Sequence, residues 1–152
     1  MQLDAVFAPT LIDLDLVAAT KEEAIRLLVN RMDAAGVLID RQKYVAAVFE
    51  REAQTPTAVG MGVAIPHGKT DAVHHSAVAL GRSKGTAWDT ETVELIFLLA
   101  VPESGATTDH LEILASLAQL LLDDNFRRAL LAARTADEAF TIITGSIRSL
   151  AC

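Results

Sequence analysis

The chain has 152 residues, of which 51% are hydrophobic and 22% are charged, and its formal net charge is −7. The apolar content excludes a disordered chain, and the length fits one domain over residues 1–152 with a substantial core. The acidic balance argues against nucleic-acid binding, which needs a concentrated basic surface.

The sequence shows neither a membrane span nor a secretion signal. The longest unbroken apolar stretch, Leu95–Val101, is far shorter than the roughly 18 residues that suggest a membrane-spanning helix. The first residues, Met1–Asp4, lack the basic and apolar regions of a signal peptide. We therefore expect a soluble, cytoplasmic protein. Cys152 is the lone cysteine, so an intrachain disulfide is impossible, and we assign it no role.

The first elements expected are a strand and a helix. Leu11–Leu16 alternates apolar and acidic residues near its end, as in a strand with one solvated face. Thr20 and Glu23 form a capping-box pattern for a helix over about Lys21–Ala35, and Gly36 is expected to end it.

The rest of the chain alternates between helical and strand periods. A second helix is expected from the N-cap Asp40 to about Arg51, since its apolar residues keep a spacing of three and four. Three strands and three later helices are then expected: strands at Met61–Ile65, Ser76–Leu80 and Val93–Val101, and helices from Asp109, at Asn125–Ala133 and at Ala136–Ile147. This order predicts an α/β domain with helices on both faces of the sheet.

The segment Val63–Gly68, which reads Val-Ala-Ile-Pro-His-Gly, joins an apolar run to a histidine. Pro66 has no N–H to donate, so we expect strand pairing to end there, and Gly68 lets the backbone turn. His67 is therefore expected at the lip of a sheet, on a loop that a rigid scaffold positions. Taken alone, such a histidine is more often structural than reactive.

Residues before and after this segment extend the pattern. Glu52, Val59-Gly60 and Val63–Gly68 together resemble the active-site histidine signature of the enzyme IIA domains of the fructose/mannitol family, which belong to the phosphoenolpyruvate-dependent sugar phosphotransferase system. The similarity continues over nearly the whole chain, through Lys69, Asp71-Ala72-Val73, Trp88, Pro102-Glu103 and His110-Leu111. The resemblance implies a mixed sheet flanked by helices.

The resemblance also implies a phosphocarrier with two neighbouring histidines. His67 is implied to accept a phosphoryl group from the histidine phosphocarrier protein and to pass it to a cysteine of a sugar-specific enzyme IIB, with no metal or organic cofactor. His110 is implied to lie beside it. A neutral imidazole is a competent nucleophile, and the helix start expected near His110 favours an anion. The alternative for His110 is a residue that only caps its helix.

Other residues of the signature have expected supporting roles. Arg51 offers a positive charge and a planar donor fork to the phosphoryl group, although an arginine at a helix end also complements the dipole. Thr57 resembles a threonine of the family's loop with the same phosphoryl-stabilising role, although a turn hydroxyl bonding its own backbone explains it equally well. Glu52 would repel a phosphate, so we expect it to orient other groups. The residues expected to set the geometry of the site loop are Gly60, Gly62, Pro66 and Gly68.

Two features do not fit the signature directly. Met61 departs from the family pattern, since many relatives carry asparagine or histidine between the two glycines, and this leaves open the loss of a polar contact. His74 and His75 suggest a metal site, but adjacent strand residues point to opposite sides, and no zinc-ligand pattern surrounds them. A solvated loop or edge position is expected for both.

Three other functions remain possible from the sequence. The first is a regulatory protein of the nitrogen-related enzyme IIA branch, which Lys69 and the segment Gly85–Trp88 argue against. The second is a hydrolytic or acid–base enzyme that uses His67 and His110, although the chain lacks a nucleophile-elbow motif and a metal-ligand set. The third is a non-catalytic interaction domain. The sequence predicts neither the sugar nor the oligomeric state.

Overall fold

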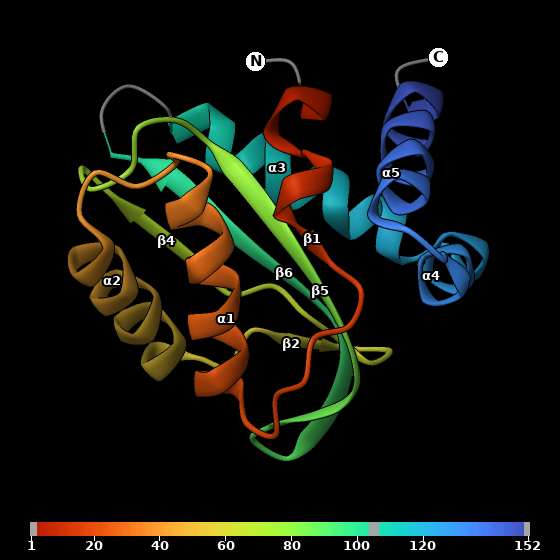
Figure 1. Ribbon diagram of the computed structural model, residues 1–152, viewed down its shortest axis with the longest axis horizontal. Helices are drawn as coiled ribbons and strands as arrows, with labels where there is room; N and C mark the ends of the chain where they lie inside the picture. Colours follow the sequence, from red (N-terminus) through yellow and green to blue (C-terminus); the bar gives the residue numbers. More distant parts are fainter. Residues whose placement is uncertain (1–2, 104–106, 151–152) are drawn as a thin grey trace.

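The computed structural model describes residues 3–103 and 107–150 (Figure 1). Within these ranges, six strands form one mixed sheet in the order β1-β5-β6-β3-β2, with β4 also paired to β6. The strands are β1 (Ile12–Asp13), β2 (Ala58–Gly60), β3 (Val63–Ala64), β4 (His67–Thr70), β5 (Ala77–Trp88) and β6 (Glu91–Pro102). β5 and β6 form a long antiparallel hairpin, whereas β3 and β4 both run parallel to β6.

Helices cover both faces of this sheet, so the predicted α/β architecture is confirmed (Figure 1). One face carries α1 (Lys21–Ala34) and α2 (Arg41–Gln54), and the other carries α3 (Thr107–Leu121), α4 (Asp124–Ala132) and α5 (Ala136–Leu150). Two short 3-10 helices, η1 (Leu3–Val6) and η2 (Pro9–Leu11), precede β1.

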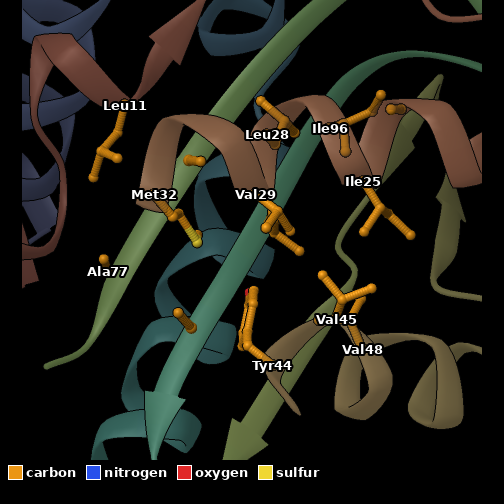
Figure 2. Close-up of a cluster of buried hydrophobic side chains, with 14 of the residues drawn as sticks. Leu11, Ile25, Leu28, Val29, Met32, Tyr44, Val45, Val48, Ala77 and Ile96 are labelled. Carbon is orange, nitrogen blue, oxygen red and sulfur yellow. The ribbon is translucent and has the colours of Figure 1, made fainter. Parts of the chain in front are cut away.

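The central strand β6 supplies side chains to the cores on both faces. Successive residues of a strand point to opposite sides, so its apolar run divides in two. The core beneath α1 and α2 contains Ile96, Leu98 and Ala100, and the opposite core contains Leu95, Phe97 and Leu99. Figure 2 shows the first of these cores, where Leu28 and Met32 of α1 and Tyr44 and Val48 of α2 lie against the sheet.

The first two helices begin at the predicted caps. The hydroxyl of Thr20 accepts the backbone N–H of Glu23 at 3.3 Å, and the Glu23 carboxylate accepts the N–H of Ala19 at 3.1 Å. Gly36, with φ +76°, follows the end of α1. The carboxylate of Asp40 caps α2 in the same way.

The predicted strand Leu11–Leu16 is mostly wrong. Only Ile12 and Asp13 pair with β5. The chain turns directly afterwards, because the Asp13 carboxylate accepts the N–H of Asp15 at 3.0 Å.

The strand predicted at Ser76–Leu80 is longer than expected and continues to Trp88. Its pairing with β6 shifts register between Arg82 and Thr86, where the sequence is polar and carries Gly85. Short-range alternation is lost over that segment, so the sequence pattern did not predict the second half of the hairpin.

Candidate functional site

The strand is interrupted at Pro66, but the segments on both sides of it pair with β6. Val63 is in register with Leu95 in β3, and His67 is in register with Leu99 in β4. Pro66 lacks an N–H, but its carbonyl accepts the N–H of Leu99 at 2.9 Å. The prediction that His67 lies on a loop after the sheet is therefore wrong: His67 is the first residue of the resumed strand.

Gly68 fixes the distance between this strand and α2. A Cβ at Gly68 would lie 2.9 Å from Val48 Cγ2 and 3.0 Å from Tyr44 Cε1. The Tyr44 hydroxyl donates to the carbonyl of Leu99 at 2.8 Å, and burial raises its pKa well above 10.0, so it remains a donor. Gly68 therefore permits close approach of a helix and makes no sharp turn.

The turn between β2 and β3 has three successive residues in the left-handed region. The φ angles of Gly60, Met61 and Gly62 are +86°, +59° and +74°. Glycine adopts this region freely, whereas a long L side chain does so at a cost. Met61 belongs to this turn and not to the strand predicted from Met61 to Ile65, and its side chain is half-exposed.

The two candidate histidines lie next to each other. Their ring centroids are 4.9 Å apart and the ring planes are tilted by 56°. His67 is only 8% exposed, and His110, on the first turn of α3, is partly exposed. His67 Nδ1 lies 3.1 Å from the carbonyl oxygen of Ile65. A carbonyl only accepts, so Nδ1 carries the proton in the neutral ring and Nε2 holds the lone pair.

Glu52 is linked to the site through Thr57, and among the described hydrogen bonds none joins its carboxylate directly to His67. Its carboxylate, 4% exposed, accepts the N–H of Thr57 at 2.9 Å, the Thr57 hydroxyl at 2.5 Å and the indole N–H of Trp88 at 3.1 Å. Lys21 Nζ lies 3.8 Å away and forms a shorter ion pair with Asp89 at 2.9 Å. The Thr57 hydroxyl proton is thus directed at Glu52, neither at its own backbone nor toward a phosphoryl group.

Arg51 lies in the last turns of α2. It is half-buried, and its guanidinium donates to the carbonyl of Thr55 at 3.0 Å. Its positive charge lowers the pKa of both His67 and His110, so it lies within electrostatic reach of both rings.

The protein-family model described as "Phosphoenolpyruvate-dependent sugar phosphotransferase system, EIIA 2" matches residues 5–146. The chain belongs to this family. It is therefore an enzyme IIA component, a phosphotransferase of the phosphoryl-carrying type.

Two relatives named as fructose-specific are similar to this enzyme IIA chain over most of its length. It is 40% identical over 129 residues to the "PTS system fructose-specific EIIA component" of Haloferax volcanii, covering 82% of this chain and 83% of that protein. It is 38% identical over 147 residues to the "PTS system fructose-specific EIIABC component" of Bacillus subtilis, covering 94% of this chain. The chain spans only 23% of the length of that second protein.

Solved structures share the fold. The nitrogen regulatory protein IIA-Ntr from Neisseria meningitidis superposes with a TM-score of 0.85 at 27% identity, over 94% of this chain and 99% of that one. The mannitol enzyme IIA of Escherichia coli, solved in complex with phosphorylated mannitol enzyme IIB, gives a TM-score of 0.78 at 28% identity, over 91% of this chain and 99% of that one.

Both histidines of this enzyme IIA favour the neutral form. Burial lowers the pKa of His67, the positive charge of Arg51 lowers it further, and the Ile65 carbonyl and Glu52 oppose these effects. Burial also lowers the pKa of His110, as do His67, Lys69 and Arg51. In the described part of the chain, His110 Nε2 is a buried ring nitrogen without a hydrogen-bond partner.

Sequence reasoning missed two members of this enzyme IIA site. Tyr44 reads as an ordinary core residue, and Lys21 as an ordinary first-turn helix residue. Trp88 entered only as part of the family resemblance. The chain has a single tryptophan, and an indole N–H needs an acceptor when it is buried. This requirement was the signal in the sequence that could have pointed to a buried polar partner for Trp88.

The remaining sequence candidates lie elsewhere. His74 and His75 occupy an exposed bend, as expected, and His75 Nδ1 lies 3.3 Å from the carbonyl of Ser76. Among the described residues, no three His, Cys, Asp or Glu side chains are grouped as metal ligands. In that same part of the chain no helix is long and apolar enough to cross a membrane. Cys152 lies outside the described residues.

Proposed function

We propose that this enzyme IIA is a phosphocarrier in which His67 Nε2 accepts a phosphoryl group from the histidine phosphocarrier protein and passes it to a cysteine of a sugar-specific enzyme IIB. The observation that carries the proposal is the hydrogen bond from His67 Nδ1 to the Ile65 carbonyl, in a ring that burial keeps neutral. Together they leave Nε2 unprotonated, beside His110. We infer that residues 1–152 act as one enzyme IIA-type domain in the cytoplasm, where phosphoenolpyruvate supplies the phosphoryl group.

Transfer needs alignment and charge compensation more than covalent help from the protein. In the first step, the Nε2 lone pair attacks phosphorus, and the P–N bond to the donor histidine breaks with its electron pair returning to the donor ring. In the second, the enzyme IIB thiolate attacks phosphorus and the P–N bond to His67 breaks. The mannitol complex of the two enzyme types supports this second step.

His110 and Arg51 are the proposed partners of the phosphoryl oxygens. His110 lies on the first turn of α3, where the helix dipole favours an anion, and its Nε2 has no partner among the described residues. A phosphate dianion on His67 would raise the pKa of His110 and favour a protonated, donating nitrogen. Arg51 adds a second positive charge at the end of α2.

The test is phosphorylation by purified phosphoenolpyruvate, enzyme I and histidine phosphocarrier protein. We expect an acid-labile, base-stable phosphate on the parent chain and none on His67→Ala. His75→Ala removes an exposed imidazole outside the site and should be labelled like the parent. Labelling of His67→Ala at the parental level would rule out this nucleophile.

A regulatory role is the second candidate, favoured by the close superposition with the nitrogen regulatory protein. The higher identity to fructose-specific relatives supports transport. Rapid transfer of phosphate from this chain to an enzyme IIB cysteine would support the transport role. A stable phosphoprotein that passes nothing to enzyme IIB would support the regulatory one.

A further inference from the structure

Trp88 connects the hydrophobic core to the histidine site through a buried carboxylate. It is fully buried at the end of β5, and its indole N–H donates to Glu52 Oε2 at 3.1 Å. An indole nitrogen is only a donor, so this bond has one possible direction. Lys21 is 3.8 Å from the same oxygen but forms its closer bonds with Asp89. Trp88 is therefore a principal restraint on the position of Glu52.

From Glu52 the connection reaches His67 through four further hydrogen bonds. The carboxylate accepts both the N–H and the hydroxyl of Thr57. The Thr57 carbonyl accepts the N–H of Ile65 at 3.0 Å. The Ile65 carbonyl in turn lies 3.1 Å from His67 Nδ1. A shift of the carboxylate would thus be transmitted to the group that sets the tautomer and orientation of the His67 ring.

We propose that Trp88 is a positioning residue for phosphoryl transfer, holding Glu52 so that His67 keeps Nε2 unprotonated and correctly directed. The inference rests on the proposed function of His67 and extends its site to a side chain that does not touch the reacting atoms. Packing alone would be served by a bicyclic aromatic ring that lacks an N–H. Among the described residues, the indole nitrogen adds a donor to a carboxylate whose other partners are Thr57 and the distant Lys21.

The test removes the N–H donor while keeping an aromatic side chain. We expect Trp88→Phe to slow phosphoryl acceptance about tenfold, since small misplacements at a reacting centre are costly. Nitrogen NMR of the unphosphorylated protein should show His67 losing its strong preference for the Nδ1-protonated tautomer. Because Trp88 is the only tryptophan, global replacement of tryptophan by 3-benzothienylalanine changes this residue alone. It gives an isosteric ring without the N–H, so the test can still be made if the phenylalanine variant folds poorly.

Thr86→Val is the matched control. Thr86 lies on the same strand and is fully buried. Its hydroxyl donates to the carbonyl of Ala18 at 2.9 Å and lies 2.8 Å from the Ser83 hydroxyl, and neither of these partners bonds to Glu52 within the described part of the chain. This variant should lose stability but keep the parental rate and tautomer. Equal slowing by Thr86→Val and Trp88→Phe would show that lost stability explains the effect and would overturn the proposal.

Glu52→Gln distinguishes the effect of the charge at residue 52 from the effect of its position. The negative charge of Glu52 raises the His67 pKa, so its removal should lower that pKa, whereas Trp88→Phe keeps the charge and should leave the pKa near the parental one. Parental rate and tautomer in both tryptophan replacements would overturn the positioning role. If the parent is not labelled on His67 yet the tautomer changes in these variants, the proposed function fails and the positioning link stands.

Discussion

At the scale of single residues, the site depends on which nitrogen of His67 holds a proton. The Ile65 carbonyl fixes the Nδ1 proton, and burial disfavours a second one. Protonation at Nε2 would remove the lone pair that attacks phosphorus in the proposed function. On that proposal, the pKa of His67 decides the pH range in which the chain accepts a phosphoryl group.

We expect acceptance to persist to lower pH than an ordinary histidine would allow. Because the pKa of His67 lies below 6.5, the rate should fall only when the pH drops through that lower value. Rates measured with pre-phosphorylated donor, beside an NMR titration of the His67 ring, check this. A ring titrating at or above 6.5 would contradict it.

The free energy of unfolding should depend on pH in the same direction as the rate of acceptance. Below pH 6.5 the unfolded chain protonates its histidines before the folded chain protonates His67 and His110, so the free energy of unfolding should decrease as pH falls. Denaturant unfolding between about pH 7 and 5 measures the slope, and His67→Gln combined with His110→Gln should flatten it.

At the scale of elements, the packing of α2 on β4 decides where His67 lies. Gly68→Ala would place a methyl group 2.9 Å from Val48 Cγ2, so we expect the free energy of unfolding to fall by about 1–3 kcal/mol and transfer to slow. Gly145→Ala is the matched control: this exposed residue inside α5 has no atom within 4 Å of the added Cβ, and the change should stabilise the helix by about 0.5–1 kcal/mol. Unfolding in urea compares the two. Equal stability of parent and Gly68→Ala would contradict the tight contact.

Elements with local signals were predictable from the sequence, and those held by distant contacts were not. α1 and α2 have caps and periodic apolar residues within a few positions, so their starts were predicted correctly, although α2 continues to Gln54, beyond the predicted Arg51. The resumption of the strand at His67 depends on pairing with residues of β6 about 30 positions away, which no local pattern encodes. The same applies to the Glu52–Trp88 bond, which joins residues 36 positions apart.

At the scale of the whole molecule, the sheet separates the two layers of helices, and the candidate site draws on both. α2 supplies Glu52 and Arg51 from one side, and α3 supplies His110 from the other, while His67 stands on the strand between them. The family resemblance alone implied that the two histidines meet, because their 43-residue separation fixes no geometry. The order of elements predicted the layers correctly.

Arg82 joins distant parts of this fold away from the histidines. Its guanidinium donates to the carbonyl of Leu14 before α1 and to the carbonyls of Leu130, Leu131 and Ala133 at the end of α4. A positive charge at a helix C-terminus also complements the dipole. Arg82→Met would leave these carbonyls without their donor.

We expect Arg82→Met to lower the free energy of unfolding by about 2–3 kcal/mol, since hydrogen bonds to a charged group are among the stronger ones. Arg128→Met, which removes an exposed arginine from α4, should change it little. Arg82 is in register with Leu95 and His67 with Leu99, about 13 Å apart along β6, so the folded Arg82→Met variant should accept phosphate at the parental rate. Denaturant unfolding and the labelling assay measure the two effects separately. A large loss of transfer in the fully folded variant would show that the end of α4 communicates with the histidine pair.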